Sequence, residues 1–297
     1  MTQKKLALSV LFLIFVVSIA LFFVFSRNTE TEISDEIVID EVYDVVETKR
    51  PLLIGTSVEG RSIEAYTYGT GEHHLLVVGG IHGGYEWNSI LLAYEMVDYF
   101  EINEKTLPEN VKITVIPSLN PDGLFKLIQK EGRFTTLDVP DESLLPSGTG
   151  RFNANNVDLN RNFNCKWQPK STWRGQVVLA GTSAFSEPEA QALQRFVTSN
   201  NISVGIFLHS QSNAVYASEC HNGVLPETLV IMNAYSNASG YRAVEEFGAY
   251  PVTGDAEGWL ASIGIPAITV ELSTHKTIEW DRNIKGIQAL ITHYATL

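Results

Sequence analysis

The strongest constraint on the fold comes from four short runs in which nearly every residue is apolar and many are β-branched. These runs are residues 75–78, 111–116, 203–208 and 267–272. A strand with one wet face alternates apolar and polar residues, so continuous apolar runs indicate strands that are covered on both faces. A helical pattern over 87–100 separates the first two runs, an order typical of parallel pairing. We therefore expect an α/β fold with three α-β-α layers around a central mixed, mostly parallel twisted sheet.

Weaker patterns extend this outline along the chain. We expect a turn at 55–60, a strand at 62–68, and a long irregular polar segment after a turn at 119–123 that runs to about residue 173. Helices are predicted over 188–198, 227–237, 241–247 and 278–294. A long irregular segment inside a compact domain is usually functional, so residues 119–173 are a candidate source of binding residues.

The amino-terminal segment predicts a membrane anchor. Lys4 and Lys5 precede the uncharged, mostly apolar run 6–25, which as a helix is about 30 Å long, the thickness of a bilayer core. The best cleavage site for a signal peptide, Ser18-Ile19-Ala20, falls inside the run, so we favour an uncleaved, single-pass signal anchor over a cleaved and secreted form. The two lysines favour a cytoplasmic amino terminus, which leaves the rest of the protein outside the cytoplasm.

Composition divides the chain into three parts. Residues 1–27 form the anchor, 28–50 form an acidic tether kept extended by like charges, and 51–297 form one large domain. The formal net charge of −13 excludes a nucleic-acid partner, which needs a basic surface. The two cysteines, Cys165 and Cys220, either form one bridge or stay free.

Several ionisable residues stand where strands end. His82 and Glu86 follow the apolar run 75–78 through a glycine-rich turn, and His209 ends the run 203–208. Glu271 interrupts the last apolar run, where a lone carboxylate is costly unless it is paired or neutralised. The carboxyl ends of strands in such sheets face the ligand crevice. Imidazole and carboxylate suit zinc, and burial raises the pKa of a carboxyl group toward that of a general base, although a buried structural ion pair is the alternative for Glu271.

At this point the sequence resembles the zinc metallocarboxypeptidases of the carboxypeptidase A type. The resemblance covers residues 52–296 and rests on short motifs in the order that the family has them. The motifs are the lead-in 54–63, His82 with Glu86, Leu119-Asn120-Pro121-Asp122-Gly123, Val157-Asp158-Leu159-Asn160-Arg161-Asn162-Phe163, His209-Ser210-Gln211 and Thr269-Val270-Glu271-Leu272. The resemblance implies a carboxypeptidase-like fold and a monomeric exopeptidase that hydrolyses the C-terminal bond of a peptide or of a peptidoglycan stem peptide.

The resemblance implies catalytic roles for the residues that match the family's motifs. His82, Glu86 and His209 would bind one Zn²⁺ per chain, and Glu271 would act as the general base toward water. One departure concerns the ligands themselves: the family spaces its first two as His-x-x-Glu, whereas here three residues separate His82 from Glu86. We expect Gly83 and Gly84 to absorb the extra residue on the turn between strand and helix.

The resemblance also implies residues that bind substrate. Asn160 and Arg161 would hold the C-terminal carboxylate, since an arginine fork matches a carboxylate in two bonds. Arg151 would stabilise the oxyanion, with Arg133 as its rival. Tyr250 would close over the bound terminus, with Tyr241 as its rival.

The segment after Tyr250 is the family's pocket for the terminal side chain. Here it contains Asp255 and Glu257, which suggests selection for a cationic residue such as Lys, Arg or diaminopimelate. In the alternative reading, Asp255 caps a helix that starts near residue 256 and Glu257 points to water.

Two other functions are compatible with parts of this pattern. One is a zinc amidohydrolase of the aspartoacylase type, which shares the His, Glu, His and Asn-Arg features but lacks the motifs at 119–123 and 269–272. The other is a non-catalytic peptide-binding module, which would have lost a ligand or the base. Four further histidines are assigned no catalytic role: His73 and His74 are expected to be solvated and His293 to be structural. His275 follows the Glu271 strand and could reach the mouth of the site, although a surface position is favoured.

Overall fold

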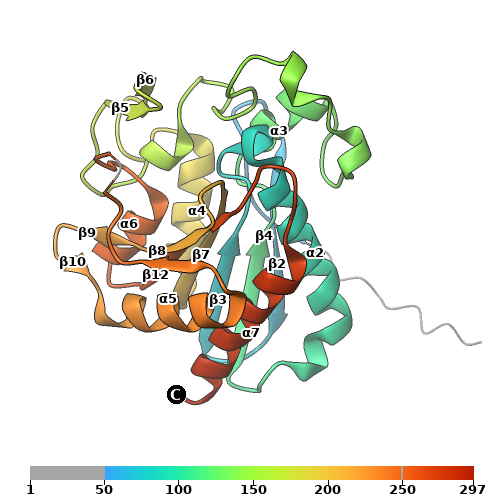
Figure 1. The fold of residues 1–297 in the computed structure, drawn as a ribbon, viewed down its shortest axis with the longest axis vertical. Helices are drawn as coiled ribbons and strands as arrows, with labels where there is room; N and C mark the ends of the chain where they lie inside the picture. The colour runs from blue at the N-terminus through green and yellow to red at the C-terminus, as the bar shows by residue number, and fades with distance from the viewer. Residues whose placement is uncertain (1–50, 249) are drawn as a thin grey trace, which may run out of the picture. The chain divides into compact units, whose positions relative to one another are not determined.

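The computed structural model describes residues 51–248 and 250–297, and these form a sheet of eight strands with helices on both faces (Figure 1). In spatial order the strands are β1 (Leu52–Thr56), β2 (Ser62–Gly69), β4 (Val111–Ile116), β3 (His73–Val78), β7 (Ile202–Ser210), β12 (Ala267–Leu272), β8 (Ala214–Ala217) and β11 (Arg242–Val244). The central strands β4, β3, β7 and β12 are mutually parallel, whereas β1, β2 and β8 add antiparallel pairs. The predicted mixed sheet is therefore confirmed, with its parallel part in the middle.

The helices form the two outer layers. One face carries α2 (Trp87–Asn103), α5 (Pro226–Ser239) and α7 (Trp280–Ala295), and Figure 1 shows α5 and α7 lying across it. The other face carries α4 (Pro188–Ser199) and α6 (Ala256–Ser262). Shorter pieces lie outside the eight-stranded sheet: α3 (Pro121–Ile128) and two hairpins, β5 (Lys170–Trp173) with β6 (Gln176–Leu179), and β9 (Glu219–Cys220) with β10 (Gly223–Val224).

The two cores explain why the strands are apolar at every position. On β3, Leu75 and Val77 belong to the core that also contains residues of α2, α5 and α7, whereas Leu76 and Val78 belong to the core that contains residues of α4 and α6. Successive side chains of a strand point to opposite faces, so a strand covered on both sides needs no polar residue. All four side chains are buried.

The parallel register brings the ends of the central strands together at one edge. The strands β3, β7 and β12 run in the same direction, and Glu271 on β12 lies directly beside His209 on β7. The chain leaves β3 and reaches His82 four residues later. Residues far apart in sequence therefore meet at the carboxyl edge, where open α/β sheets bind their ligands.

Some local predictions were wrong. Residues 241–247 were expected to be helical, but β11 pairs in parallel with β8, and this sheet edge overrides the local helical pattern. The turn expected at 119–123 is the start of α3, where the Asn120 side chain accepts a hydrogen bond from the Gly123 amide at 2.9 Å. The segment 119–173 is therefore less irregular than its composition indicates.

His74 was wrongly assigned to a solvated turn. The strand β3 begins before the apolar run, and His74 on it is only 1% exposed, with Nε2 2.7 Å from Thr114 Oγ1. Burial, helped by the nearby charge of Lys112, lowers the pKa of His74 to about 4. His293 does have a structural partner, because its Nε2 lies 2.6 Å from a Glu227 carboxylate oxygen.

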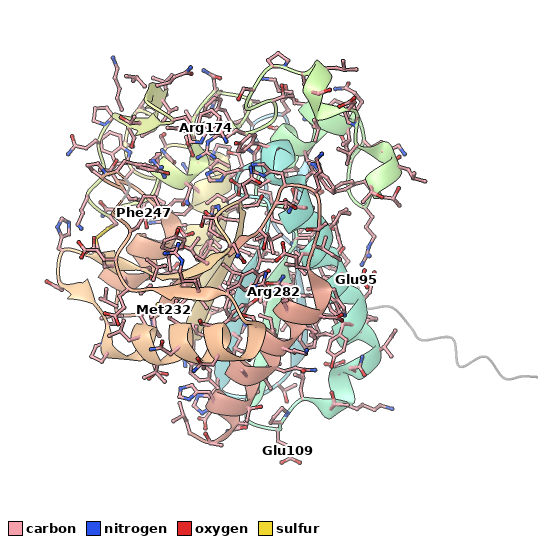
Figure 2. The ribbon with its side chains drawn as sticks, viewed as in Figure 1. Glu95, Glu109, Arg174, Met232, Phe247 and Arg282 are labelled. Carbon is pink, nitrogen blue, oxygen red and sulfur yellow. A yellow bond between two sulfur atoms is a disulfide. The ribbon has the colours of Figure 1, made fainter. Side chains whose placement is uncertain are left out.

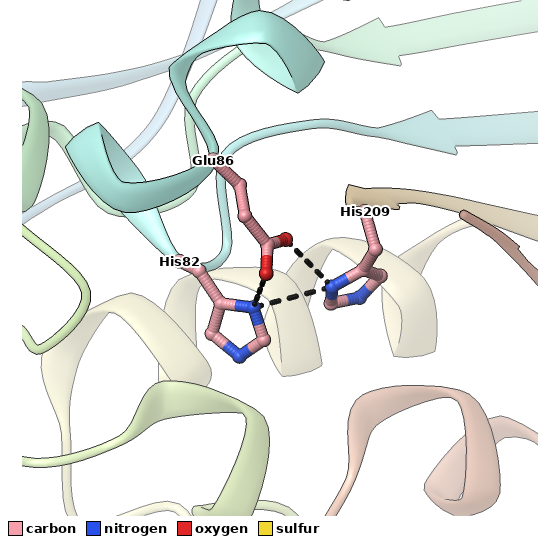
Figure 3. Close-up of side chains that lie close together, drawn as sticks. All are labelled: His82, Glu86 and His209. Atoms are coloured by element: carbon pink, nitrogen blue, oxygen red, sulfur yellow. Dashed lines mark hydrogen bonds and ion pairs between the residues drawn. The ribbon is translucent and has the colours of Figure 1, made fainter. Parts of the chain in front are cut away.

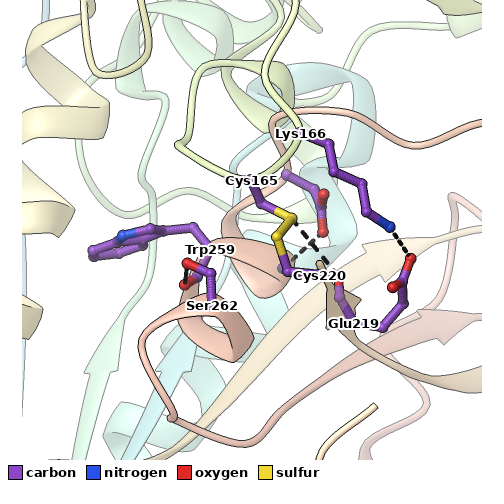
Figure 4. The surroundings of a disulfide bond; sticks show 8 residues. Cys165, Lys166, Glu219, Cys220, Trp259 and Ser262 are labelled. Carbon is purple, nitrogen blue, oxygen red and sulfur yellow. Dashed lines mark hydrogen bonds and ion pairs between the residues drawn. A yellow bond between two sulfur atoms is a disulfide. The ribbon is translucent and has the colours of Figure 1, made fainter. Parts of the chain in front are cut away.

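The two cysteines form a disulfide between segments that are distant in sequence (Figure 4). Cys165 follows the Asn160-Arg161 loop and Cys220 lies on β9, with their Cα atoms 5.9 Å apart. Lys166 pairs with Glu219 beside the bridge at 2.5 Å. The bridge thus ties the expected substrate-binding loop to the rim of the sheet.

The predicted anchor over 6–25 and the acidic tether over 28–50 lie outside the described residues. Within 51–248 and 250–297, no helix combines the length and the apolar character needed to cross a bilayer. The division into anchor, tether and domain stays a prediction.

Candidate active site

Three buried side chains converge at the carboxyl edge of the sheet (Figure 3). Glu86 directs one carboxylate oxygen to His82 Nδ1, at 2.9 Å, and the other to His209 Nδ1, at 3.0 Å. The two Nδ1 atoms themselves are 3.2 Å apart. No other group of three or more His, Cys, Asp or Glu side chains in the described part of the chain brings ligand atoms together in this way.

The geometry of this group fits a metal ion. Two ligands at zinc–nitrogen distances of about 2.0–2.1 Å and near-tetrahedral angles lie about 3.3 Å apart, close to the separation of the two Nδ1 atoms. Each ring turns its other nitrogen toward a carboxylate: His209 Nε2 lies 3.0 Å from Glu257 Oε1, and His82 Nε2 lies 3.4 Å from Asp158 Oδ1. A proton held on each Nε2 leaves two Nδ1 lone pairs facing each other, an arrangement that a cation between them stabilises.

Charge stabilises the ionised form of the carboxylate in this group. Burial opposes the ionisation of Glu86, but the two histidines outweigh it, so the pKa of Glu86 lies well below its ordinary value. Asp158 behaves likewise: burial opposes its charge, and Arg151 and His82 hold its pKa well below the ordinary range. Glu86 therefore offers an ionised carboxylate as a metal ligand at neutral pH, and Asp158 is ionised beside His82.

Local backbone structure explains the unusual spacing of the first two ligands. His82 precedes a 3-10 turn, η1 (Gly83–Glu86), so Glu86 stands just before α2 begins at Trp87. Gly83 has a φ of +45°, and a Cβ there would lie 2.7 Å from the Gly150 carbonyl oxygen. The glycine lets the 148–151 loop approach the ligand turn, and the expectation that Gly83 and Gly84 accommodate the extra residue stays a prediction.

Glu271 faces the same cavity as the three ligands. Its Oε2 is shielded from solvent and has no hydrogen-bond partner among the described residues. Burial, followed by the negative charge of Glu86, raises the pKa of Glu271 to about 7. A carboxyl group in this environment can accept a proton near neutral pH.

The expected substrate-binding residues line this cavity, which has a volume of about 840 Å³. Arg151 is buried, donates from Nε and Nη2 to Asp158 Oδ2 at 3.1 and 2.9 Å, and places Nη1 3.6 Å from Glu86. Its rival Arg133 lies away from the cavity and pairs with Asp98 at 2.8 Å. Arg151 is therefore the arginine that lies beside the metal ligands.

Asn160 and Arg161, the expected clamp for a terminal carboxylate, lie next to α6 and Tyr250 respectively. Asn160 Oδ1 accepts a hydrogen bond from the Ala256 amide at 2.9 Å, and the Arg161 guanidinium lies 6.0 Å from the ring centroid of Tyr250. Arg161 is 3% exposed, whereas Tyr250 is 36% exposed at the rim. The rival Tyr241 is buried elsewhere and donates to Glu279 at 2.6 Å.

Asp255 and Glu257 both line the cavity, the cationic preference stays a prediction, and the alternative reading of the segment is right for one residue and wrong for the other. Asp255 does cap α6, since its carboxylate accepts from the Gly258 amide at 2.7 Å. Glu257 does not point to water: it is 2% exposed and accepts hydrogen bonds from His209 and Thr269. Burial and then the charge of Glu257 raise the pKa of Asp255 to about 6, so both carboxylates are ionised only above that pH.

Sequence reasoning missed several residues of the cavity. A surface position was favoured for His275, with the mouth of the site as the alternative, and the structure places it in the cavity lining with Nδ1 2.7 Å from Ser210 Oγ. Asp158 sits inside a quoted motif, and its position two residues before Asn160 is the only signal that could have marked it. Trp173 and Arg174, from the β5–β6 hairpin, had no signal beyond the glycine after Arg174.

Fold and site together define a metal-dependent hydrolase centre: two imidazoles and a carboxylate around one position, with a second carboxylate and an arginine beside it. A model of the family described as zinc carboxypeptidase matches residues 44–288. The chain therefore belongs to the zinc carboxypeptidase family, and zinc is the metal that the site is expected to hold.

Individual relatives are distant. A γ-D-glutamyl-L-diamino acid endopeptidase of Lysinibacillus sphaericus is 24% identical over 74% of this chain and 60% of its own length. A carboxypeptidase B of Helicoverpa zea is 26% identical over 79% of this chain and 61% of its own length. The chain thus spans about 60% of the length of these curated relatives.

Solved structures share the fold. The structure of thrombin-activatable fibrinolysis inhibitor aligns with a TM-score of 0.66 at 18% identity, covering 83% of this chain and 69% of the other. Murein-tripeptide amidase MpaA of Escherichia coli O157 aligns with a TM-score of 0.56 at 20% identity, covering 83% of this chain and 92% of the other.

Proposed function

We propose that the protein is a zinc-dependent exopeptidase that hydrolyses the C-terminal bond of a peptide or of a cell-wall stem peptide. The observation that carries this proposal is the convergence of His82, Glu86 and His209 in the cavity that also contains Glu271 and Arg161. Family membership favours this reaction over the aspartoacylase-type alternative and over a non-catalytic module.

The residues divide the reaction between them. Zinc bound by His82, Glu86 and His209 would supply a Lewis acid that polarises the scissile carbonyl and makes water more acidic. Glu271 accepts a proton from the attacking water and later delivers it to the leaving amine. Arg151 donates to the oxygen that gains negative charge as the carbonyl is attacked.

The clamp gives the reaction its direction along the peptide. Arg161 and Asn160 bind the C-terminal carboxylate, and Tyr250 at the rim covers it. Because the clamp lies in the same cavity as the ligands, the bond next to the terminal residue is the one presented to them. This placement supports cleavage at the end of a peptide, which is the exopeptidase reaction.

The experiment that tests the proposal combines metal content with hydrolysis. Purified protein is expected to carry one zinc ion per chain and to release the C-terminal residue of a blocked peptide. Removing zinc with a chelator should abolish release and adding zinc should restore it. Metal-free protein that keeps full activity would contradict the proposal.

A cationic terminal residue is the preferred substrate in this proposal. Asp255 and Glu257 line the cavity next to the clamp, and both are ionised above about pH 6. The relative from Lysinibacillus sphaericus, named for a diamino acid, supports a substrate of this kind. Peptides ending in Lys, diaminopimelate and Phe distinguish the cases, and faster release of Phe would overturn the preference.

We further propose that the domain works outside the cytoplasm as a membrane-anchored monomer. The apolar run 6–25 and the Cys165–Cys220 disulfide support this location, because disulfides persist in oxidising compartments. Protease treatment of intact cells is expected to release an active fragment. Retention of all activity inside the cytoplasm would contradict the location.

A further inference from the structure

The cavity is also lined by an arginine, Arg174, that the sequence did not assign to the site. Arg174 forms, with Gly175, the two-residue turn of the β5–β6 hairpin, in which Trp173 pairs with Gln176. Both turn residues have positive φ, 50° and 75°, as the tight hairpin turns that match strand twist require. Figure 2 labels Arg174 near this hairpin. The turn geometry therefore fixes where the arginine leaves the backbone.

Aromatic packing holds the tip of the hairpin against the metal-binding turn. The Trp173 ring lies 5.3 Å from the Tyr85 ring, edge to face, and the Arg151 guanidinium lies 4.6 Å from the Trp173 ring centroid. Tyr85 directly precedes the ligand Glu86. The Arg174 guanidinium lies 5.4 Å from the Trp173 ring and 5.8 Å from the Tyr85 ring. Such stacking positions the cation without neutralising its charge.

The other cations of the cavity have defined partners or a defined role. Arg151 is paired with Asp158, Lys166 is paired with Glu219, and Arg161 belongs to the terminal carboxylate clamp. Arg174 is exposed, and among the described residues no carboxylate lies within ion-pair distance of it. Among the described residues, the cavity thus presents two arginines without an ion-pair partner, Arg161 and Arg174, and only Arg161 has an expected role.

The two arginines that are open to ligands occupy different walls. Arg161 lies beside Tyr250, whereas Arg174 lies beside Tyr85 on the wall that supplies Glu86. If Arg161 holds the terminal carboxylate and the scissile bond lies at the metal ligands, the residue that supplies the acyl group extends past the ligands toward the wall of Tyr85 and Arg174.

We propose that Arg174, held by Trp173 and Tyr85, binds a carboxylate carried by the acyl-side residue of the substrate. This inference rests on the proposed exopeptidase function. It adds that the preferred substrate carries a second carboxylate besides its C-terminal one. Two substrates supply the chemistry: a γ-linked glutamyl residue, whose α-carboxylate is free, and an α-linked residue with an acidic side chain. Charge-assisted pairing with a guanidinium serves both.

Binding tests the proposal independently of catalysis. Zinc-loaded Glu271→Gln protein is titrated by calorimetry with a γ-D-glutamyl-L-lysine peptide and with its α-carboxamide analogue, which differ only in one charge. The free carboxylate should bind about tenfold more tightly, a difference of about 1.4 kcal/mol. Adding Arg174→Gln should bring the two affinities together by weakening only the carboxylate form.

Matched variants distinguish the effect of the positive charge at Arg174 from the effect of any positive charge on the β5–β6 hairpin. Arg174→Lys should keep part of the discrimination, and Lys170→Gln, which removes a charge from an exposed residue of the same hairpin outside the cavity, should keep all of it. An α-linked peptide with a glutamate side chain shows which carboxylate source is preferred; preference for either over its amide supports the proposal.

Equal affinities for carboxylate and carboxamide in the protein that retains Arg174 would overturn the inference. If the wild-type holoenzyme then still releases C-terminal residues, the exopeptidase proposal stands and only the role of Arg174 fails. If the wild type neither binds nor cleaves any of these peptides, both proposals fail.

Discussion

At the scale of single residues, Glu257 has a role that its sequence context concealed. Its carboxylate accepts the hydrogen bond of His209 Nε2 at 3.0 Å, so it orients a metal ligand and fixes the protonated nitrogen of that ring. Sequence reasoning placed Glu257 in the substrate pocket because of its position after Tyr250. A contact between α6 and the end of β7 cannot be read from either segment alone.

We predict that Glu257→Gln weakens zinc binding about 10- to 100-fold, the range usual for partners of metal-bound histidines. Competition against a chromophoric chelator at pH 7 measures the zinc dissociation constant. Glu246→Gln, which removes the same charge from an exposed residue of the same cavity, is the control and should change it little. Equal effects of both variants would contradict the assignment.

A second prediction concerns Glu271 and the pH dependence of kcat/KM. Burial, and then the charge of Glu86, raises the pKa of Glu271 to about 7, so the group is protonated and unable to act as a base below that value. Lowering the pH should therefore reduce kcat/KM, with a midpoint at or below 7 because a bound cation favours the carboxylate.

The pH dependence is measured as a profile of kcat/KM at saturating zinc. Glu271→Gln should lower kcat about 10²- to 10⁴-fold, the usual contribution of a general base, and should remove the acidic limb from the residual rate. A variant that retains the wild-type rate, or the same limb, would show that another group titrates.

At the scale of elements, the disulfide and its neighbours position the loop that carries Asn160 and Arg161, the proposed clamp. The Phe163 amide donates to the Gly254 carbonyl at 2.9 Å, and the Gly254 amide donates to the Cys165 carbonyl at 2.6 Å. A Cβ on Gly254 would lie 2.1 Å from the Arg161 carbonyl oxygen, so the two segments meet backbone to backbone. The disulfide from Cys165 to Cys220 connects the same loop covalently to β9.

The Cys165→Ser, Cys220→Ser double variant is expected to lose about 2–4 kcal/mol of unfolding free energy, measured by urea denaturation. Because the clamp loop loses its tie, KM should rise more than kcat falls. Wild-type protein treated with reductant provides the matched comparison without a sequence change. Unchanged stability and unchanged KM in both samples would contradict a positioning role for the bridge.

Helices and strands could be predicted where the burial of apolar side chains determines the secondary structure. They could not be predicted where pairing with a distant strand determines it. The helices α2, α4, α5 and α7 and the four central strands appeared from periodicity and apolar runs, because both faces of the sheet are covered. Residues 242–244 became a strand only because β8 offers a parallel edge. The β5–β6 hairpin is mostly exposed and polar, so no burial pattern marked it.

At the scale of the whole molecule, one geometric fact organises the site: parallel strands end at a common edge. It brings His209 beside Glu271 in register and delivers His82 and Glu86 from the end of β3. The motifs indicated these residues in the sequence, since each motif contains its own functional side chain. The carboxylates behind the histidines and the Arg174 wall were not predictable, because they depend on contacts between motifs.

The most direct test of the account is the position of zinc in crystals of the zinc-loaded protein, located by anomalous scattering at the zinc edge. We predict one peak per chain, about 2.0–2.2 Å from Nδ1 of His82, Nδ1 of His209 and a Glu86 carboxylate oxygen. A peak bound by other atoms, or no peak at this position, would contradict the assignment of Glu86 as a ligand despite the extra residue before it, and with it the central claim.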